Sequence, residues 1–158
     1  LPDDLILATP GCLKQMVDIY HKVGGNLVAV EDVPREETNR YGILEIAHDD
    51  GHIAKAHGLI EKPEPDNAPS TLSVIGRYIL QPDIFKYLNK HKKGAGGEIQ
   101  LTDAISKTIS RVDLHGLRFK GRRFDCGTKI GFVAANMAFA MGHEEMRKDI
   151  REIIGSML

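Results

Sequence analysis

Apolar residues recur at helical spacing in several parts of the chain and predict its helices. After Thr9-Pro10-Gly11, a stripe from Leu13 to Tyr20 repeats every three or four residues. Gly24-Gly25 ends this pattern, as glycine commonly does at the end of a helix. Comparable stripes predict helices over Ile99–Ser110, 130–141 and 142–158. The last of these is amphipathic, so its apolar face requires cover from the domain or from a second subunit.

Continuous or alternating apolar runs predict strands between these helices. Asn26–Val33 contains Leu27-Val28-Ala29-Val30, a run typical of a buried strand. Gly42–His48 and His52–Lys62 alternate on either side of Asp49-Asp50-Gly51, and the Asp-Gly step favours a tight hairpin. Further strands are predicted over Thr71–Leu80 and Leu114–Lys120.

The connections are rich in proline, glycine and charge. Pro34–Arg40 is predicted to be a surface excursion, and Lys62–Pro69 a proline-rich loop. A short helix is predicted over Asp83–Lys90, followed by a flexible connection at Lys92–Gly97. The glycines of that connection lie between helices, and Gly24-Gly25 follows a helix. We therefore interpret both as structural, because phosphate-binding loops join a strand to a helix.

Composition and charge are typical of one ordinary globular domain. A chain of 158 residues can bury a sizeable core, and its net charge of -1 provides no basic surface for nucleic acid. An anionic substrate would therefore have to meet a local cluster of Lys and Arg. No apolar run approaches the length of a membrane span. Cys12 and Cys126 are far apart in sequence, which favours reduced thiols, and we expect a cytoplasmic protein without nucleic-acid or membrane partners.

The chain begins with an acidic corner, Leu1-Pro2-Asp3-Asp4, of the kind that ends a buried strand. Open α/β sheets bind ligands at the carboxyl ends of their strands, where carboxylates hold a metal beside a phosphate. Proline and aspartate are also common in ordinary surface turns. The residues alone leave a metal site and a surface turn as alternatives.

Glu61-Lys62-Pro63 places a carboxylate and an ammonium where a predicted strand gives way to a loop. Proline disfavours the helical region for the residue before it, so an extended backbone is predicted at Lys62. Glu61 and Lys62 would then face different ways, one accepting hydrogen bonds from sugar hydroxyls and the other neutralising a phosphate. A solvated surface ion pair is the alternative.

Phe124-Asp125-Cys126-Gly127 also places a carboxylate after a predicted strand. Gly127 would allow a ligand to approach the backbone closely, and a helix start follows. Asp125 is equally suited to binding a ligand and to capping that helix. The histidines show no spacing typical of a metal site.

Taken in order, these motifs resemble the bacterial UTP–glucose-1-phosphate uridylyltransferases, or UDP-glucose pyrophosphorylases. The matching segments are Leu1-Pro2-Asp3-Asp4, Tyr41-Gly42, Glu61-Lys62-Pro63, Val74–Leu80, Gly94–Ile105 and Phe124–Lys129. The resemblance spans most of the chain, and the run from Gly94 to Ile105 is its most specific part. Val33–Arg40 and the C-terminal tail offer no motif to match.

The resemblance implies that Asp3 is the metal-binding aspartate and takes part in catalysis. Asp125 is implied as a second carboxylate on the same metal, for which Mg²⁺ is expected. Asp4 is a weaker candidate near the site.

The resemblance also implies contacts to the sugar phosphate. Gly42 and Glu61 would contact the glucose hydroxyls, and Lys62 would bind the phosphate and act in catalysis. Gly76 and Arg77 are weaker candidates for substrate binding.

The implied fold is α/β, a Rossmann-like nucleotide-diphospho-sugar transferase fold with a mixed sheet flanked by helices. The implied reaction joins UTP and glucose 1-phosphate to give UDP-glucose and pyrophosphate. Because of the amphipathic tail, we also expect a homo-oligomer.

One departure from the family is large, because its Gly-rich nucleotide loop, G-x-G-T-R followed by Pro and Lys, does not occur in this sequence. We therefore expect residues 1–158 to be the C-terminal, sugar-phosphate-binding portion of a single nucleotidyltransferase domain, lacking the N-terminal nucleotide-binding part and inactive alone. The alternatives are a related enzyme that uses dTTP or GTP, and a non-catalytic module for sugar-phosphate binding or assembly.

Overall fold

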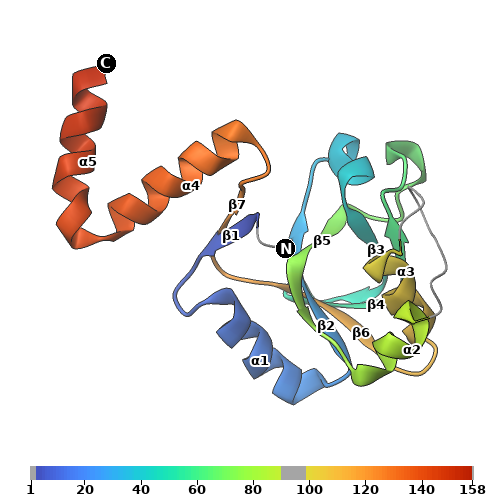
Figure 1. Ribbon diagram of the computed structural model, residues 1–158. Helices are drawn as coiled ribbons and strands as arrows, with labels where there is room; N and C mark the ends of the chain where they lie inside the picture. Colours follow the sequence, from blue (N-terminus) through green and yellow to red (C-terminus); the bar gives the residue numbers. More distant parts are fainter. Residues whose placement is uncertain (1–2, 90–98, 158) are drawn as a thin grey trace. The chain divides into compact units, whose positions relative to one another are not determined.

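The computed structural model describes residues 3–89 and 99–157 and divides the chain into two compact units (Figure 1). The barrel unit is Cys12–Phe119, and the terminal unit combines Leu1–Gly11 with Lys120–Leu158. The predicted connection Lys92–Gly97 lies outside the described residues. Within the described ranges, no helix has both the length and the apolar character needed to cross a membrane.

A mixed five-stranded sheet forms the barrel unit and closes on itself in the order β2-β5-β3-β4-β6 (Figure 1). The strands are β2 (Asn26–Asp32), β3 (Gly42–Asp49), β4 (Ile53–Glu61), β5 (Leu72–Ile79) and β6 (Leu114–Arg118). The β2 and β6 strands pair in parallel, whereas the other neighbours are antiparallel. The mixed sheet and the strand positions agree with the prediction, while closure of the sheet was not visible in the sequence.

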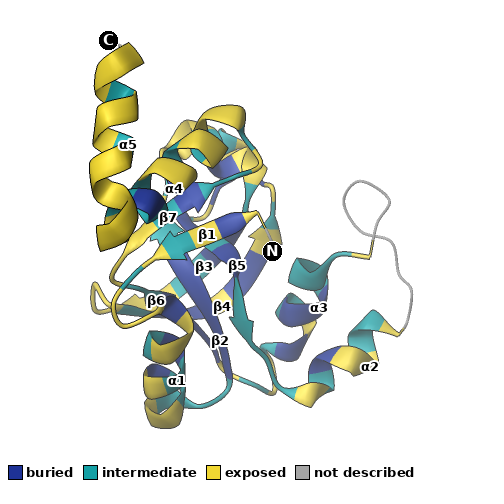
Figure 2. Ribbon diagram, turned by 60° about the vertical axis from the view of Figure 1, so that its left-hand side comes forward, coloured by how far each residue is buried: buried dark blue, intermediate teal, exposed yellow. Residues whose placement is uncertain are grey.

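Helices cover the barrel unit on more than one side. Helix α1 (Cys12–Val23) contacts β2, β5 and β6, and helix α3 (Leu101–Thr108) contacts β4 and the short helix α2 (Phe85–Leu88). The β2 strand is consequently buried on both faces, as Figure 2 shows by its dark colour. This burial explains why its sequence is a continuous apolar run instead of an alternating one.

The hydrophobic core of the barrel unit joins alternate strand residues to α3 and to the segment before α2. Its fully buried members include Val28, Leu44, Leu72, Ile105 and Leu114. Burying such a side chain stabilises a fold by about 1.5–3 kcal/mol each relative to leaving it exposed. The core therefore fixes α3 and the strands β3 and β4, at whose ends the predicted residues Gly42 and Glu61 lie.

Gly24 and Gly25 end helix α1 with positive φ angles of 63° and 69°. The Gly24 N–H donates to the Tyr20 carbonyl at 2.8 Å, which closes the last turn. A Cβ on Gly25 would lie 2.5 Å from the carbonyl oxygen of Asp113. Both glycines therefore serve the chain reversal, and the structural interpretation of this pair is confirmed.

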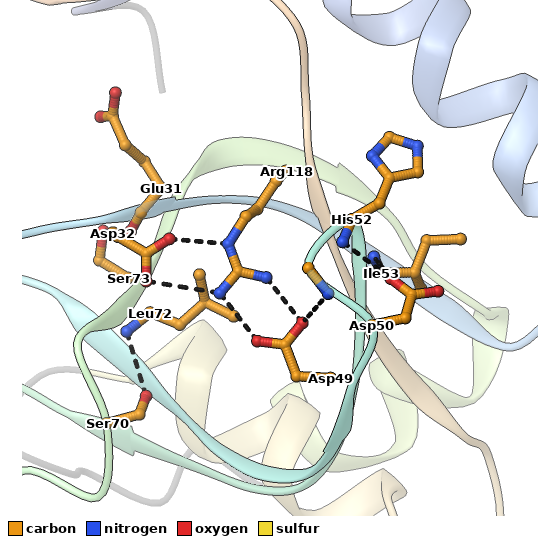
Figure 3. A network of polar contacts seen from close by, with 11 residues as sticks. Glu31, Asp32, Asp49, Asp50, His52, Ile53, Ser70, Leu72, Ser73 and Arg118 are labelled. Atoms are coloured by element: carbon orange, nitrogen blue, oxygen red, sulfur yellow. Dashed lines mark hydrogen bonds and ion pairs between the residues drawn. The ribbon is translucent and has the colours of Figure 1, made fainter.

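The predicted hairpin between β3 and β4 is confirmed, with Gly51 at φ 85° in its turn. Figure 3 shows how Arg118 of β6 anchors this turn to the sheet. Its guanidinium donates to Asp49 through two nitrogens, at 2.8 and 2.9 Å, and its Nε donates to Asp32 at 2.7 Å. The bond from Arg118 lowers the pKa of Asp49, and the two carboxylates raise the pKa of Arg118.

The terminal unit is a two-stranded sheet with two helices. The antiparallel strands are β1 (Asp4–Leu7) and β7 (Arg122–Asp125), and the helices are α4 (Lys129–Gly142) and α5 (Glu144–Met157). The α5 helix lies within the range 142–158 for which an amphipathic helix was predicted. Strand β1 was not predicted, and the acidic corner begins this strand instead of ending one. Four residues are too few to reveal a strand by alternation, so pairing with β7 decides its conformation.

Candidate functional site

The carboxylates of Asp3 and Asp125 approach the same point beside Gly127 in the terminal unit. Asp4 pairs with Asp125 in the β1/β7 register, and the Cys126 N–H donates to the Asp3 carbonyl at 2.8 Å. A Cβ added to Gly127 would lie 3.0 Å from Asp125 Oδ1 and 3.4 Å from Asp3 Oδ2. The two strands thus bring together carboxylates that are far apart in sequence.

The orientation of Asp125 is fixed by its own loop. Its Oδ1 accepts a hydrogen bond of 3.0 Å from the Gly127 N–H. Helix α4 is capped by Thr128, whose Oγ1 accepts from the Gly131 N–H at 3.1 Å. Asp125 was predicted either to cap this helix or to bind a ligand. Because Thr128 fills the cap position, Asp125 is not the cap of α4.

Asp4 has a different environment from its neighbour Asp3. Its carboxylate is buried and accepts a hydrogen bond from Arg123 Nε at 2.5 Å, whereas Asp3 is exposed. Loss of either partner would leave an uncompensated charge in a buried position, so Asp4 is committed to its pair with Arg123. Of the two acidic residues at this corner, Asp3 is the one open to a ligand.

The pair Asp3 and Asp125 suits a hard cation such as Mg²⁺. This ion commonly uses only one or two protein carboxylates, because waters and substrate phosphates complete its octahedral coordination. Gly127 leaves the space between the two carboxylates without a side chain. Among residues 3–89 and 99–157, no group of three or more His, Cys, Asp or Glu side chains is arranged to hold a metal. The donor set thus fits a metal that shares its coordination with a phosphate ligand.

A second group of predicted residues comes together in the barrel unit, where Gly42 opens β3 and Glu61 ends β4. The two residues are direct partners in the register of these strands. A Cβ on Gly42 would lie 3.3 Å from Glu61 Oε2 and 3.4 Å from Thr102 Oγ1. The Thr102 hydroxyl donates to Glu61 Oε2 at 2.5 Å. Glycine at position 42 thus leaves room for the Glu61 carboxylate against the backbone.

Lys62 follows Glu61 directly and has an unusual backbone, with a positive φ of 48°. The prediction of an extended backbone at this residue was wrong. The Lys62 N–H donates to the Tyr41 carbonyl at 2.9 Å and continues the β3/β4 pairing, and the chain then turns so that Pro63 is buried. The left-handed conformation allows this turn at a cost of roughly 1–2 kcal/mol for a residue with a Cβ. Strain of this kind is concentrated at functional sites.

Glu61 and Lys62, which were alternatively expected to form a surface ion pair, do not pair with each other in the structure. Both residues are described, and the carboxylate of Glu61 is bound by Thr102 instead. No hydrogen bond or ion pair of the Lys62 ammonium occurs among the described residues, and this side chain is exposed. The ammonium is therefore placed to meet an anion from solution.

Gly76 and Arg77 lie in an irregular part of strand β5. Val28 of β2 pairs with Tyr78, whereas Val30 pairs with Val74, so β5 has more residues than β2 between these two pairs. Such bulges commonly contain glycine and redirect neighbouring side chains. Arg77 lies near Cys12 at the start of α1, where burial raises the pKa of the thiol and the Arg77 charge partly offsets this.

The residue that sequence reasoning missed is Thr102. It belongs to the segment Gly94–Ile105 that gave the most specific part of the resemblance, but no role was assigned to it. Its contact with Glu61 joins residues 41 positions apart. No local pattern around either residue indicates this bond.

Comparison with known proteins identifies the class to which this fold and these residues belong. The model of the nucleotidyl transferase family matches residues 1–141, and the chain belongs to this family. UTP–glucose-1-phosphate uridylyltransferase of Komagataeibacter xylinus is 57% identical over 130 residues, which cover 82% of this chain and 46% of that protein. The enzyme of the same name from Bacillus subtilis strain 168 is 41% identical over 159 residues, covering 100% of this chain and 54% of the relative.

A solved structure agrees with these relatives. The crystal structure of UDP-glucose pyrophosphorylase complexed with UDP-glucose has 39% sequence identity to the chain and a TM-score of 0.83, covering 90% of this chain and 55% of the other. The nucleotide-sugar transferase fold and the resemblance to bacterial uridylyltransferases are thereby confirmed. The chain spans about half the length of the curated relatives it matches.

Proposed function

We propose that an enzyme containing this chain transfers the uridylyl group of UTP to glucose 1-phosphate, giving UDP-glucose and pyrophosphate. The observation that best supports this function is the arrangement at the end of β4. There the Glu61 carboxylate is held against the Gly42 backbone. The next residue is Lys62, whose ammonium has no hydrogen bond or ion pair among the described residues. A carboxylate for hydroxyls beside an ammonium for phosphate matches the chemistry of a sugar phosphate.

The reaction requires no protein nucleophile. An oxygen of the glucose 1-phosphate phosphate attacks the α-phosphorus of UTP, and the bond from that phosphorus to the bridging oxygen of the β-phosphate breaks. Pyrophosphate leaves with the electron pair of that bond. Catalysis of such transfers is mainly positioning and charge stabilisation. Glu61 would orient the sugar by accepting hydrogen bonds, and the Lys62 ammonium would hold the phosphate and offset its charge.

Asp3 and Asp125 would hold Mg²⁺, which supplies charge neutralisation to a bound phosphate. Amide NMR shifts of the chain during Mg²⁺ titration test this part of the proposal. We expect the amides of Cys126 and Gly127 to respond and the response to disappear in Asp125→Asn. Asp18→Asn is a control, because Asp18 lies on α1 in an exposed pair with Lys14. A response unchanged in Asp125→Asn would contradict the metal assignment.

Turnover tests the reaction itself, in a protein of the relatives' full length that contains this sequence. We expect Lys62→Ala to reduce pyrophosphate release about 10²-fold or more, as expected for one positioned charge in such a site. Lys62→Arg should restore only part of the rate, because the guanidinium is broader and its donors point differently. Lys55→Ala is the matched control, since Lys55 lies on β4, the strand that ends directly before Lys62, and pairs with Asp113. Near-normal turnover of Lys62→Ala would contradict the proposal, and a preference for dTTP or GTP would redirect it to a related transferase.

The proposal includes a homo-oligomer in the cytoplasm. Helices α4 and α5 line an apolar groove with Met137, Ile150, Ile153, Ile154 and Met157, and a second copy would cover such a surface. Cys12 and Cys126 are both free thiols, as a reducing compartment would keep them. Light scattering at several concentrations tests the oligomer, and a mass that stays that of one chain would contradict it.

A further inference from the structure

The hydroxyl of Thr102 is directed at the carboxylate that the proposed function assigns to the sugar. Thr102 is the second residue of α3, and Glu61 is the last residue of β4. Their side chains meet in a hydrogen bond of 2.5 Å from Thr102 Oγ1 to Glu61 Oε2. The helix and the strand are both fixed by the core of the barrel unit through Leu59 and Ile105. The bond therefore joins two rigid elements.

This bond is not an ordinary helix cap. A threonine near the start of a helix commonly accepts a hydrogen bond from a backbone N–H of the first turn. In α3 the cap position is Gln100, and no side chain caps the helix there. Thr102 instead donates to a residue on another element. The hydroxyl serves the carboxylate and not the helix.

Gly42 lies against both partners of this hydrogen bond. The position of a Cβ on Gly42 is 3.3 Å from Glu61 Oε2 and 3.4 Å from both Oγ1 and Cγ2 of Thr102. Oε2 thus contacts the threonine hydroxyl and also lies close to the β3 backbone at Gly42. Glu61 Oε1 has no hydrogen-bond partner among the residues that the structure describes.

We propose that Thr102 is a positioning residue that locks one oxygen of the Glu61 carboxylate and leaves the other to accept a hydrogen bond from a hydroxyl of the sugar phosphate. This inference rests on the proposed function. A Glu side chain free to rotate would lose conformational entropy each time it bound a sugar. With Oε2 already bound to Thr102, that ordering is present before the substrate arrives.

The test compares Thr102→Val, which keeps the shape but removes the hydroxyl, with Thr102→Ser, which keeps the hydroxyl. In the full-length enzyme we expect Thr102→Val to raise the KM for glucose 1-phosphate about tenfold, the effect of losing one hydrogen bond to a charged group. The KM for UTP and kcat should change by less than about threefold, because the bond acts on sugar binding. Thr102→Ser should stay near the parent value.

A double-mutant cycle shows whether Thr102 acts through Glu61. Glu61→Ala should itself raise the KM for glucose 1-phosphate, and adding Thr102→Val to it should have no further effect. Thr108→Val is the structural control, because the Thr108 hydroxyl lies buried in the same helix and accepts a bond from Asn26. It should lower the unfolding temperature without changing this KM.

The outcomes separate the two ideas. If Glu61→Ala leaves the KM for glucose 1-phosphate unchanged, the sugar-binding role of Glu61 is wrong. If Glu61→Ala raises it but Thr102→Val does not, or Thr102→Ser is as impaired as Thr102→Val, positioning by Thr102 is wrong. Should Thr102→Val fail to fold, Thr102→Ala removes the hydroxyl without adding a methyl group. The KM of Thr102→Ala for glucose 1-phosphate then tests positioning by the same criteria.

Discussion

Arg123 and Asp4 form a buried ion pair across the β1/β7 sheet, with Arg123 Nε 2.5 Å from Asp4 Oδ1. The exposed fractions of the two side chains are only 9% and 7%. The residue before Asp4 has a different environment, because Asp3 is exposed and its carboxylate lies close to that of Asp125. The two adjacent carboxylates therefore have different environments: Asp4 is committed to its pair with Arg123, whereas Asp3 is the one to which the proposed function assigns the metal.

Removing one partner of this pair should destabilise the terminal unit strongly. We expect Arg123→Met to lower the free energy of unfolding by about 3–5 kcal/mol, because it leaves a buried carboxylate without its cation. Asp3→Asn should change it by less than about 0.5 kcal/mol, as exposed substitutions usually do. Urea denaturation of the three proteins measures both values. Equal effects of the two substitutions would show that the pair has no special structural role.

Replacing Lys62 by glycine should have opposite effects on stability and activity, because it relieves the positive φ but removes the ammonium. Lys62→Gly should raise the free energy of unfolding by up to about 1 kcal/mol, because glycine adopts this conformation without strain. Lys62→Ala should give no such gain, since alanine retains the Cβ. Both variants should lose turnover together with the ammonium. Thermal unfolding and pyrophosphate release measure the two effects, and a stabilising Lys62→Ala would argue against backbone strain.

Gly42→Ala should disturb sugar binding while leaving the fold intact. Its methyl group would lie 3.3 Å from Glu61 Oε2, close enough that the carboxylate must shift. We expect the KM for glucose 1-phosphate to rise at least fivefold with little change in unfolding temperature, an effect that corresponds to about 1 kcal/mol. Gly11→Ala is the control, because no atom lies within 4 Å of a Cβ at that position. An unchanged KM in Gly42→Ala would mean that Glu61 tolerates the displacement.

His115 predicts a loss of stability on mild acidification. Burial lowers its pKa from the ordinary value of 6.5, with Asp113 raising the pKa in part and Lys55 lowering it further. The unfolded chain then binds a proton at His115 more readily than the folded chain does. The contribution of neutral His115 to the free energy of unfolding is therefore intact above about pH 6.5 and is lost as the pH falls below that value. For one proton, the free energy of unfolding can fall by as much as about 1.4 kcal/mol per pH unit.

Urea denaturation at pH 7.5 and pH 5.5 measures this effect, with His115→Gln as the comparison. The variant removes the titrating group, so the difference between the two proteins isolates it from groups such as Asp49. We expect the stability of the variant to depend less on pH. An identical pH dependence in both proteins would exclude His115 as the cause.

Local chemistry made much of the fold predictable from sequence. The Asp49-Asp50-Gly51 turn and the Gly24-Gly25 helix end each depend on residues a few positions apart. The candidate site was less predictable, because its contacts are distant in sequence. Thr102 lies 41 positions from Glu61, and Arg123 lies 119 from Asp4. The backbone of Lys62 was mispredicted for the same reason, since the Tyr41 carbonyl and the burial of Pro63 outweigh the local preference set by proline.

The irregular pairing at Gly76 and Arg77 limits how the length of β5 can change. Val74 and Tyr78, on either side of it, both pack against the same core cluster. Side chains alternate along a strand, so two residues stay on one face when an odd number of residues, here three, lies between them. Removing Gly76 alone would move the side chains of one half of β5 from the core face of the sheet to the opposite face. Removing Gly76 and Arg77 together would keep the core residues of both halves on the same face. Insertions and deletions at this point are therefore compatible with the core only in steps of two residues.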